Sequence, residues 1–124
     1  MSTREAAAEI VSIAFLSREQ AHREHLRTGS YAAHVALQEF YEAVVEKADA
    51  FAEVFQGTYG ALGDVPYREA AKGKIDVVLE DHLEGIEDAR KAFGKSPCDR
   101  PLDNLLDELS ALYARTLFKL RRLS

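Results

Sequence analysis

Three of the four histidines in this 124-residue chain lie within thirteen residues, in the stretch HREHLRTGSYAAH that begins at position 22. An acid pair spaced by one helical turn begins fifteen residues after the last of these histidines. Neutral imidazoles and carboxylates together form a mixed nitrogen and oxygen donor set, which suits iron, zinc or manganese. The pattern therefore predicts a metal site whose candidate ligands are His25, His34, Asp49 and Glu53, with His22 as a further candidate.

The two kinds of ligand cannot meet within one copy of the chain. His34 and Asp49 are expected on one straight helix, where fifteen residues at 1.5 Å each separate them by about 22 Å along the axis. Metal–ligand bonds, in contrast, are only about 2 Å long. His34 and Asp49 nevertheless lie on the same side of the helix, because 100° per residue places them within about 60° of each other around the axis. A second copy of the helix, packed antiparallel about a two-fold axis, would bring His34 to Asp49 and Glu53 of its partner. The predicted partner is therefore the protein itself, as a homodimer with two identical sites.

Hydrophobic periodicity predicts four helices that form a single all-α domain over residues 1–124. The first helix begins at Ser2 or Thr3 and stops at Thr28-Gly29, and Ser30 caps a second helix that runs to about Gln56. A third helix ends at Phe93-Gly94, and its start is left open. The fourth helix follows Pro101 and carries a continuous leucine seam.

The connection between the second and third helices is unusually long for a four-helix bundle. It includes GTYGALGDVP and, in the longer alternative, everything up to Gly73. Simple up-and-down bundles need loops of only about 2–8 residues. Roughly ten to seventeen extended residues at about 3.3 Å each could run back along a helix of about 39 Å. The length favours a bundle with a crossover between helices 2 and 3, and the simple up-and-down order is the alternative.

The pattern H-x2-H, a short turn with glycine, and then H-x14-D-x3-E resembles the mini-ferritins, the starvation-inducible DNA-binding (Dps) family of the ferritin-like superfamily. The stretch HLRTGSYAAHVALQEFY is most similar to short mini-ferritin relatives encoded by phages. The resemblance covers about residues 18 to 60. It implies a ferritin-like bundle in which His25 and His34 of one subunit face Asp49 and Glu53 of another. If the turn is aligned without a gap, His22 takes the first histidine position.

The resemblance also implies an activity, namely binding of iron between subunits and oxidation of Fe(II) by oxygen or peroxide, in iron storage and oxidative protection. Zinc or manganese are alternative metals, and a larger shell is the assembly that the family suggests. Two other functions stay open from the residues themselves. One is a non-catalytic helical interaction protein, such as a phage accessory or structural protein, and the other is a dimer held by zinc without redox turnover.

Charge and cysteine content restrict which partners and which cellular compartment the protein can have. The net charge is −5, with 21 acidic against 16 basic residues, which argues against a nucleic-acid coat and predicts weak DNA binding or none. Basic residues gather only near the C-terminus, where cations complement a helix dipole; they are Arg115, Lys119, Arg121 and Arg122. One cysteine, Cys98, cannot form an internal disulfide, and no apolar run approaches about 18 residues. These features predict a cytoplasmic protein without a membrane partner.

The fourth histidine, His82, lies at the centre of the apolar face of the third helix. A buried imidazole needs a hydrogen-bond partner, and Tyr113 or Thr116 on the fourth helix are the candidates. We therefore expect His82 to be a core residue and not a metal ligand.

Overall fold

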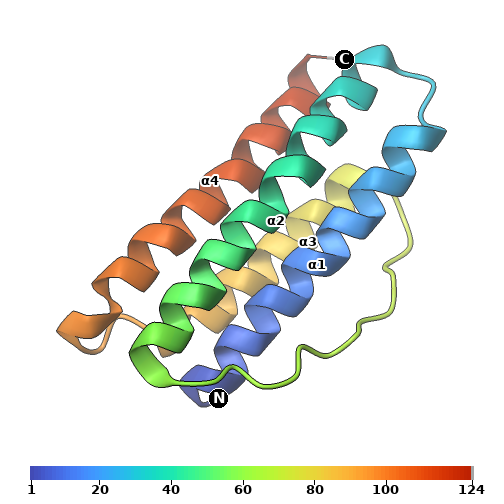
Figure 1. The fold of residues 1–124 in the computed structure, drawn as a ribbon. Helices are drawn as coiled ribbons and strands as arrows, with labels where there is room; N and C mark the ends of the chain where they lie inside the picture. The colour runs from blue at the N-terminus through green and yellow to red at the C-terminus, as the bar shows by residue number, and fades with distance from the viewer. Residues whose placement is uncertain (124) are drawn as a thin grey trace.

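The computed structural model describes residues 1–123 and consists of four α-helices and two short 3-10 segments. In chain order they are α1 (Thr3–Arg27), α2 (Tyr31–Tyr59), α3 (Ile75–Ala89), η1 (Arg90–Ala92), η2 (Pro97–Asp99) and α4 (Arg100–Arg122). No strand occurs among residues 1–123. Figure 1 shows the four helices lying side by side in one bundle. The predicted all-α, four-helix architecture is confirmed.

The first two helices begin at the caps that their sequences suggest. Ser2 Oγ accepts from the Glu5 backbone N–H at 3.0 Å, while the Glu5 carboxylate accepts from the Ser2 N–H at 3.1 Å. This reciprocal pair is a capping box, and it satisfies two amide groups that would otherwise lack partners. Ser30 caps α2 by accepting from the Ala33 N–H at 3.1 Å. The short turn between α1 and α2 therefore brings the end of one helix next to the start of the other.

Residues 60–74 form an extended connection that lies along α1. Ser12 Oγ donates to the Pro66 carbonyl at 2.6 Å, and Gln20 exchanges two hydrogen bonds with the backbone of Ala71, at 2.8 and 3.1 Å. Because Gln20 is two turns beyond Ser12, the connection advances along α1 in the same direction as the helix. These contacts satisfy backbone groups of Pro66 and Ala71, and α3 begins at Ile75.

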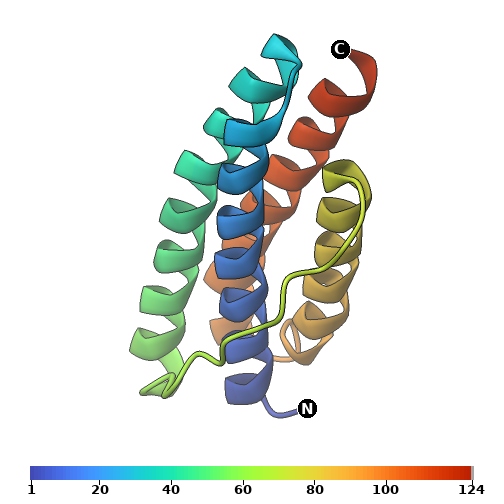
Figure 2. The ribbon, with the colours of Figure 1, turned by 90° about the vertical axis from the view of Figure 1, so that its right-hand side faces the viewer.

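The direction of the connection determines the relative directions of α2 and α3. It starts at the end of α2 and reaches the opposite end of the molecule before α3 begins, so α2 and α3 run in the same direction (Figures 1 and 2). An ion pair between Arg68 and Glu9, at 2.6 Å, adds a further attachment to α1. None of the helices within residues 1–123 combines the length and the apolar character that crossing a membrane requires.

A single core fills the space between the helices. Its largest fully buried side chains come from all four helices, and among them are Phe40, Phe51, Leu79, Leu106 and Tyr113. Small residues let α1 approach α3 closely, since a Cβ atom at Gly85 would lie only 3.0 Å from Ile13 Cδ1. The core therefore fixes the relative positions of the helices that carry the candidate ligands.

His82 occupies this core, as predicted, but its partner is a residue that the sequence did not indicate. Its Nδ1 lies 2.7 Å from Ser17 Oγ on α1, and Tyr113 O–H donates to the same Ser17 oxygen at 2.6 Å. Thr116 instead donates to the Leu112 carbonyl of its own helix. Burial lowers the pKa of His82 below its ordinary value and raises that of Tyr113.

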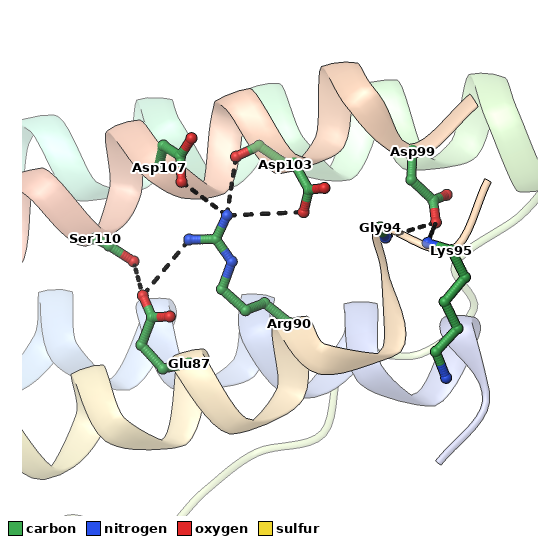
Figure 3. Close-up of polar contacts among 8 residues, drawn as sticks. All are labelled: Glu87, Arg90, Gly94, Lys95, Asp99, Asp103, Asp107 and Ser110. Carbon is green, nitrogen blue, oxygen red and sulfur yellow. Dashed lines mark hydrogen bonds and ion pairs between the residues drawn. The ribbon is translucent and has the colours of Figure 1, made fainter. Parts of the chain in front are cut away.

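Polar contacts hold the turn between α3 and α4 (Figure 3). Arg90 bridges to α4 by donating to the Asp103 carbonyl at 3.1 Å and to the Asp107 carboxylate at 2.8 Å. Asp99, which is 2% exposed, accepts from the backbone N–H groups of Gly94 and Lys95 at 2.8 and 3.3 Å. These contacts close the turn at the end of the bundle opposite the histidines.

The same Asp99 ties this turn to the end of α2. Tyr59 O–H donates to the Asp99 carboxylate, and this hydrogen bond raises the pKa of Tyr59 to about 12. Burial disfavours the charged form of Asp99, but the bonds from Tyr59 and from the backbone outweigh burial and lower the pKa of Asp99. The C-terminal half of α2, which carries the candidate acids, is therefore anchored to the start of α4.

Candidate metal centre

The turn between α1 and α2 places His25 and His34 face to face. Their ring centroids are 3.7 Å apart and their planes differ by 17°. His25 is buried, with 7% of its surface exposed, and His34 is half-buried. The capped start of α2, directly after the end of α1, is what brings residues nine apart in the chain into contact.

Hydrogen bonds fix the tautomer of both rings. His25 Nδ1 donates to the His34 carbonyl at 2.7 Å, and His34 Nδ1 donates to the His25 carbonyl at 2.8 Å. Since a carbonyl oxygen can only accept, Nδ1 carries the proton in each neutral ring and Nε2 keeps its lone pair. Metal-binding histidines are commonly oriented in this way, with the other ring nitrogen bonded to a carbonyl or a carboxylate. The same two bonds also join the ends of α1 and α2 whether or not a metal is bound.

His22 has a different neighbour. Its ring stacks on Tyr41 with centroids 4.1 Å apart and planes 17° apart, and it lies 6.0 Å from the ring of His25. The Arg18 guanidinium lies 5.7 Å from the centroid of the same tyrosine ring, within cation–π range. The ring that contacts His34 is therefore that of His25, while Tyr41 is packed between α1 and α2 as the neighbour of His22.

Asp49 and Glu53 lie on the outward face of α2 and are both exposed. They share the helix with His34, so Asp49 lies about 22 Å from it along the axis, as the rise per residue requires. Neither acid has a hydrogen-bond or ion-pair partner within residues 1–123. In that part of the chain no three His, Cys, Asp or Glu side chains come together in a group that could hold a metal. The structure brings two of the candidate ligands together and leaves the other two open to the solvent.

Comparison with known protein families assigns the chain to one of them. The profile of the Family of unknown function (DUF5856) matches residues 25–120. The chain belongs to that family. The match includes all of α2, α3 and nearly all of α4, and it begins at His25, so that His22 lies outside it. No curated protein and no solved structure matches this DUF5856 member.

The donor set of this DUF5856 member fits a borderline divalent cation. Two imidazole nitrogens with free lone pairs and two carboxylates without partners in residues 1–123 give a nitrogen and oxygen set of the kind that iron, zinc and manganese accept. Gln38, on the same outward face, donates from its side-chain amide to the Glu42 carboxylate at 2.9 Å. Because the histidines and the acids lie about 22 Å apart along α2, one chain does not bring all four side chains together.

Proposed function

We propose that this DUF5856 member is a Dps-like mini-ferritin, which binds Fe(II) at two inter-subunit sites and oxidises it with oxygen or peroxide. In the proposed dimer two α2 helices pack antiparallel, so that His25 and His34 of each chain meet Asp49 and Glu53 of the other. Zinc or manganese are the other cations that this donor set accepts. Oxidation of Fe(II) would serve iron storage and protection against peroxide.

The observation that carries this proposal is the reciprocal pair formed by His25 and His34. Both Nδ1–H groups are bonded to carbonyls, at 2.7 and 2.8 Å, so both Nε2 atoms are ready to bind a cation without further rearrangement of the proton. The ring centroids lie 3.7 Å apart, so the two nitrogen donors are held on neighbouring side chains before any cation arrives.

Each residue has a distinct chemical part in this proposal. The histidines hold Fe(II) through neutral nitrogens, and Asp49 anchors the ion from the second chain. Glu53 adds negative charge, which stabilises the ferric product more than the ferrous substrate. With peroxide as oxidant, two Fe(II) ions each give up one electron, and the peroxide takes up two protons to leave as two water molecules.

The order of the helices supports the same proposal. A ferritin-like bundle needs its second and third helices to run in one direction, with a long connection that crosses between the bundle ends. The extended residues 60–74 and their bonds to Ser12 and Gln20 on α1 are consistent with that arrangement. Ordering the long connection costs conformational entropy, and its hydrogen bonds to α1 offset part of that cost.

The test compares the wild-type chain with the double variant Asp49→Asn/Glu53→Gln. These acids make no hydrogen bond within residues 1–123, so the variant is expected to fold normally. Fe(II) added in air should be oxidised several times faster with wild-type protein than in buffer alone, and the double variant should return the rate to that of buffer. The appearance of Fe(III) is followed by its near-ultraviolet absorbance.

A matched control removes two negative charges elsewhere. Glu69 and Glu84 are exposed and lie in the connection and on α3, away from the histidines. The variant Glu69→Gln/Glu84→Gln should oxidise Fe(II) as fast as wild type. Equal rates for wild type and Asp49→Asn/Glu53→Gln would refute the oxidase, and binding of Zn²⁺ without any oxidation of Fe(II) would instead support a structural zinc dimer.

A further inference from the structure

The outward face of α2 carries negative charge that no Lys or Arg within residues 1–123 balances. The exposed acids on this face are Glu42, Glu46, Asp49 and Glu53. The only Lys or Arg in α2 is Lys47, which pairs with Glu108 on α4, on another side of the helix. Glu39 is likewise engaged by Lys119 of α4. The face that would meet a second copy is therefore acidic, and within residues 1–123 its four exposed acids make no ion pair.

The antiparallel register brings these acids together. If His34 lies opposite the midpoint of Asp49 and Glu53, facing residues have numbers that sum to about 85, and the two-fold axis passes close to Glu42. Glu42 then lies next to the same residue of the second copy. Glu46 lies opposite Glu39, whose charge is partly balanced by Lys119 of its own chain. The two Glu42 side chains at the centre of the pairing therefore carry the main like charges, which oppose association.

Apolar contacts at this face are sparse. Among the exposed large apolar side chains, α2 contributes only Tyr31 and Tyr59, one at each end of the helix. Stable dimers without ions usually rest on an apolar central patch, and the centre of this face is occupied by carboxylates. Cations bound between the histidines and the acids would supply both the missing attraction and the missing positive charge.

We propose that the divalent cation is the switch for assembly: the metal-free chain is a monomer, and metal binding joins two copies through α2. This inference rests on the inter-subunit site of the proposed function. The partner is a second copy of the same chain, because the histidine end of α2 complements its own acidic end when the helix is reversed. Two cations per dimer follow from the two-fold symmetry.

The experiment measures particle mass by sedimentation, first in chelator and then during titration with Zn²⁺, which cannot undergo redox turnover. The metal-free protein should sediment as the 13.8 kDa chain, and about one Zn²⁺ per chain should convert it to a particle of about 28 kDa, twice that mass. The variant Asp49→Asn/Glu53→Gln should remain at 13.8 kDa at the same Zn²⁺ concentration.

A second variant tests the role of the central charges separately from the ligands. Glu42→Gln/Glu46→Gln keeps every proposed ligand and removes the like charges near the axis, so it should dimerise at a Zn²⁺ concentration at least about tenfold lower than wild type. The control Glu69→Gln/Glu84→Gln should dimerise as wild type does. If Glu42→Gln/Glu46→Gln also matches wild type, the charge-gated assembly is wrong.

Two outcomes separate this inference from the proposed function. A dimer that persists in chelator and still binds one Zn²⁺ per chain, lost in Asp49→Asn/Glu53→Gln, overturns the switch and leaves the shared site standing. Absence of Zn²⁺ binding by calorimetry, at whatever particle mass, overturns the shared site itself.

Discussion

Complementation between two defective chains follows directly from a site that two subunits share. One chain carries His25→Gln/His34→Gln, which keeps an amide N–H donor at each position but removes the imidazole Nε2 atoms. The other carries Asp49→Asn/Glu53→Gln. Neither chain alone can form a complete site in a homodimer. A heterodimer of the two has one intact site, built from the histidines of the second chain and the acids of the first, and one site that lacks all four ligands.

The size of the recovery follows from this geometry. Random pairing of equal amounts makes about half of the dimers heterodimers, each with one of its two sites intact, so about a quarter of the wild-type sites return. If cations select the heterodimer during assembly, the recovery rises toward about half. A site within a single chain would recover nothing, but such a site would have to span the roughly 22 Å between His34 and Asp49.

The assay mixes the two metal-free proteins before Fe(II) or Zn²⁺ is added. Bound Zn²⁺ per chain by calorimetry and the initial rate of Fe(II) oxidation should both reach between about a quarter and a half of the wild-type value. Each variant alone should show the background level. Recovery of neither quantity, from variants whose circular dichroism and thermal unfolding match wild type, would refute the inter-subunit arrangement. Full activity of either variant alone would refute the ligand assignment.

Two further predictions concern the fold around the site. His82→Leu should flatten the dependence of stability on pH: burial lowers the pKa of His82 in the folded state, so the unfolded chain takes up the proton first, and the free energy of unfolding of wild type should fall as the pH drops below about 6.5. Urea unfolding at several pH values measures this, and an unchanged slope in the variant would contradict the lowered pKa of His82. Asp99→Asn should lower the pKa of Tyr59 from about 12 toward its ordinary value of 10.0, because the negative charge that accepts its proton is lost. Titration of tyrosinate absorbance measures this shift, and an unchanged profile would contradict the contact.

The helices themselves follow from the sequence because local signals determine them. Apolar spacing and the caps at Ser2 and Ser30 act within a few residues of the feature that they specify. The second helix extends to Tyr59, beyond the predicted end at about Gln56, and Tyr59 donates a hydrogen bond to Asp99, 40 residues further along the chain. Such a contact leaves no local signal in the sequence.

The start of α3 shows the same limitation. The stretch from Tyr67 to Gly73 contains residues with good helix propensity, yet it is not helical, and Gln20 makes two hydrogen bonds with the backbone of Ala71 within it. The choice between the two histidines of α1 was equally beyond the sequence. His22 and His25 share one face of α1, and in the structure His25 stacks on His34 while His22 stacks on Tyr41.

An anomalous-scattering map from crystals grown with Zn²⁺ would show directly which side chains bind the metal. The shared site predicts one strong metal peak for each chain, bound by Nε2 of His25 and His34 of one subunit and by the carboxylates of Asp49 and Glu53 of its neighbour. A peak whose ligands all come from one chain, or two α2 helices that do not pack antiparallel, would contradict it.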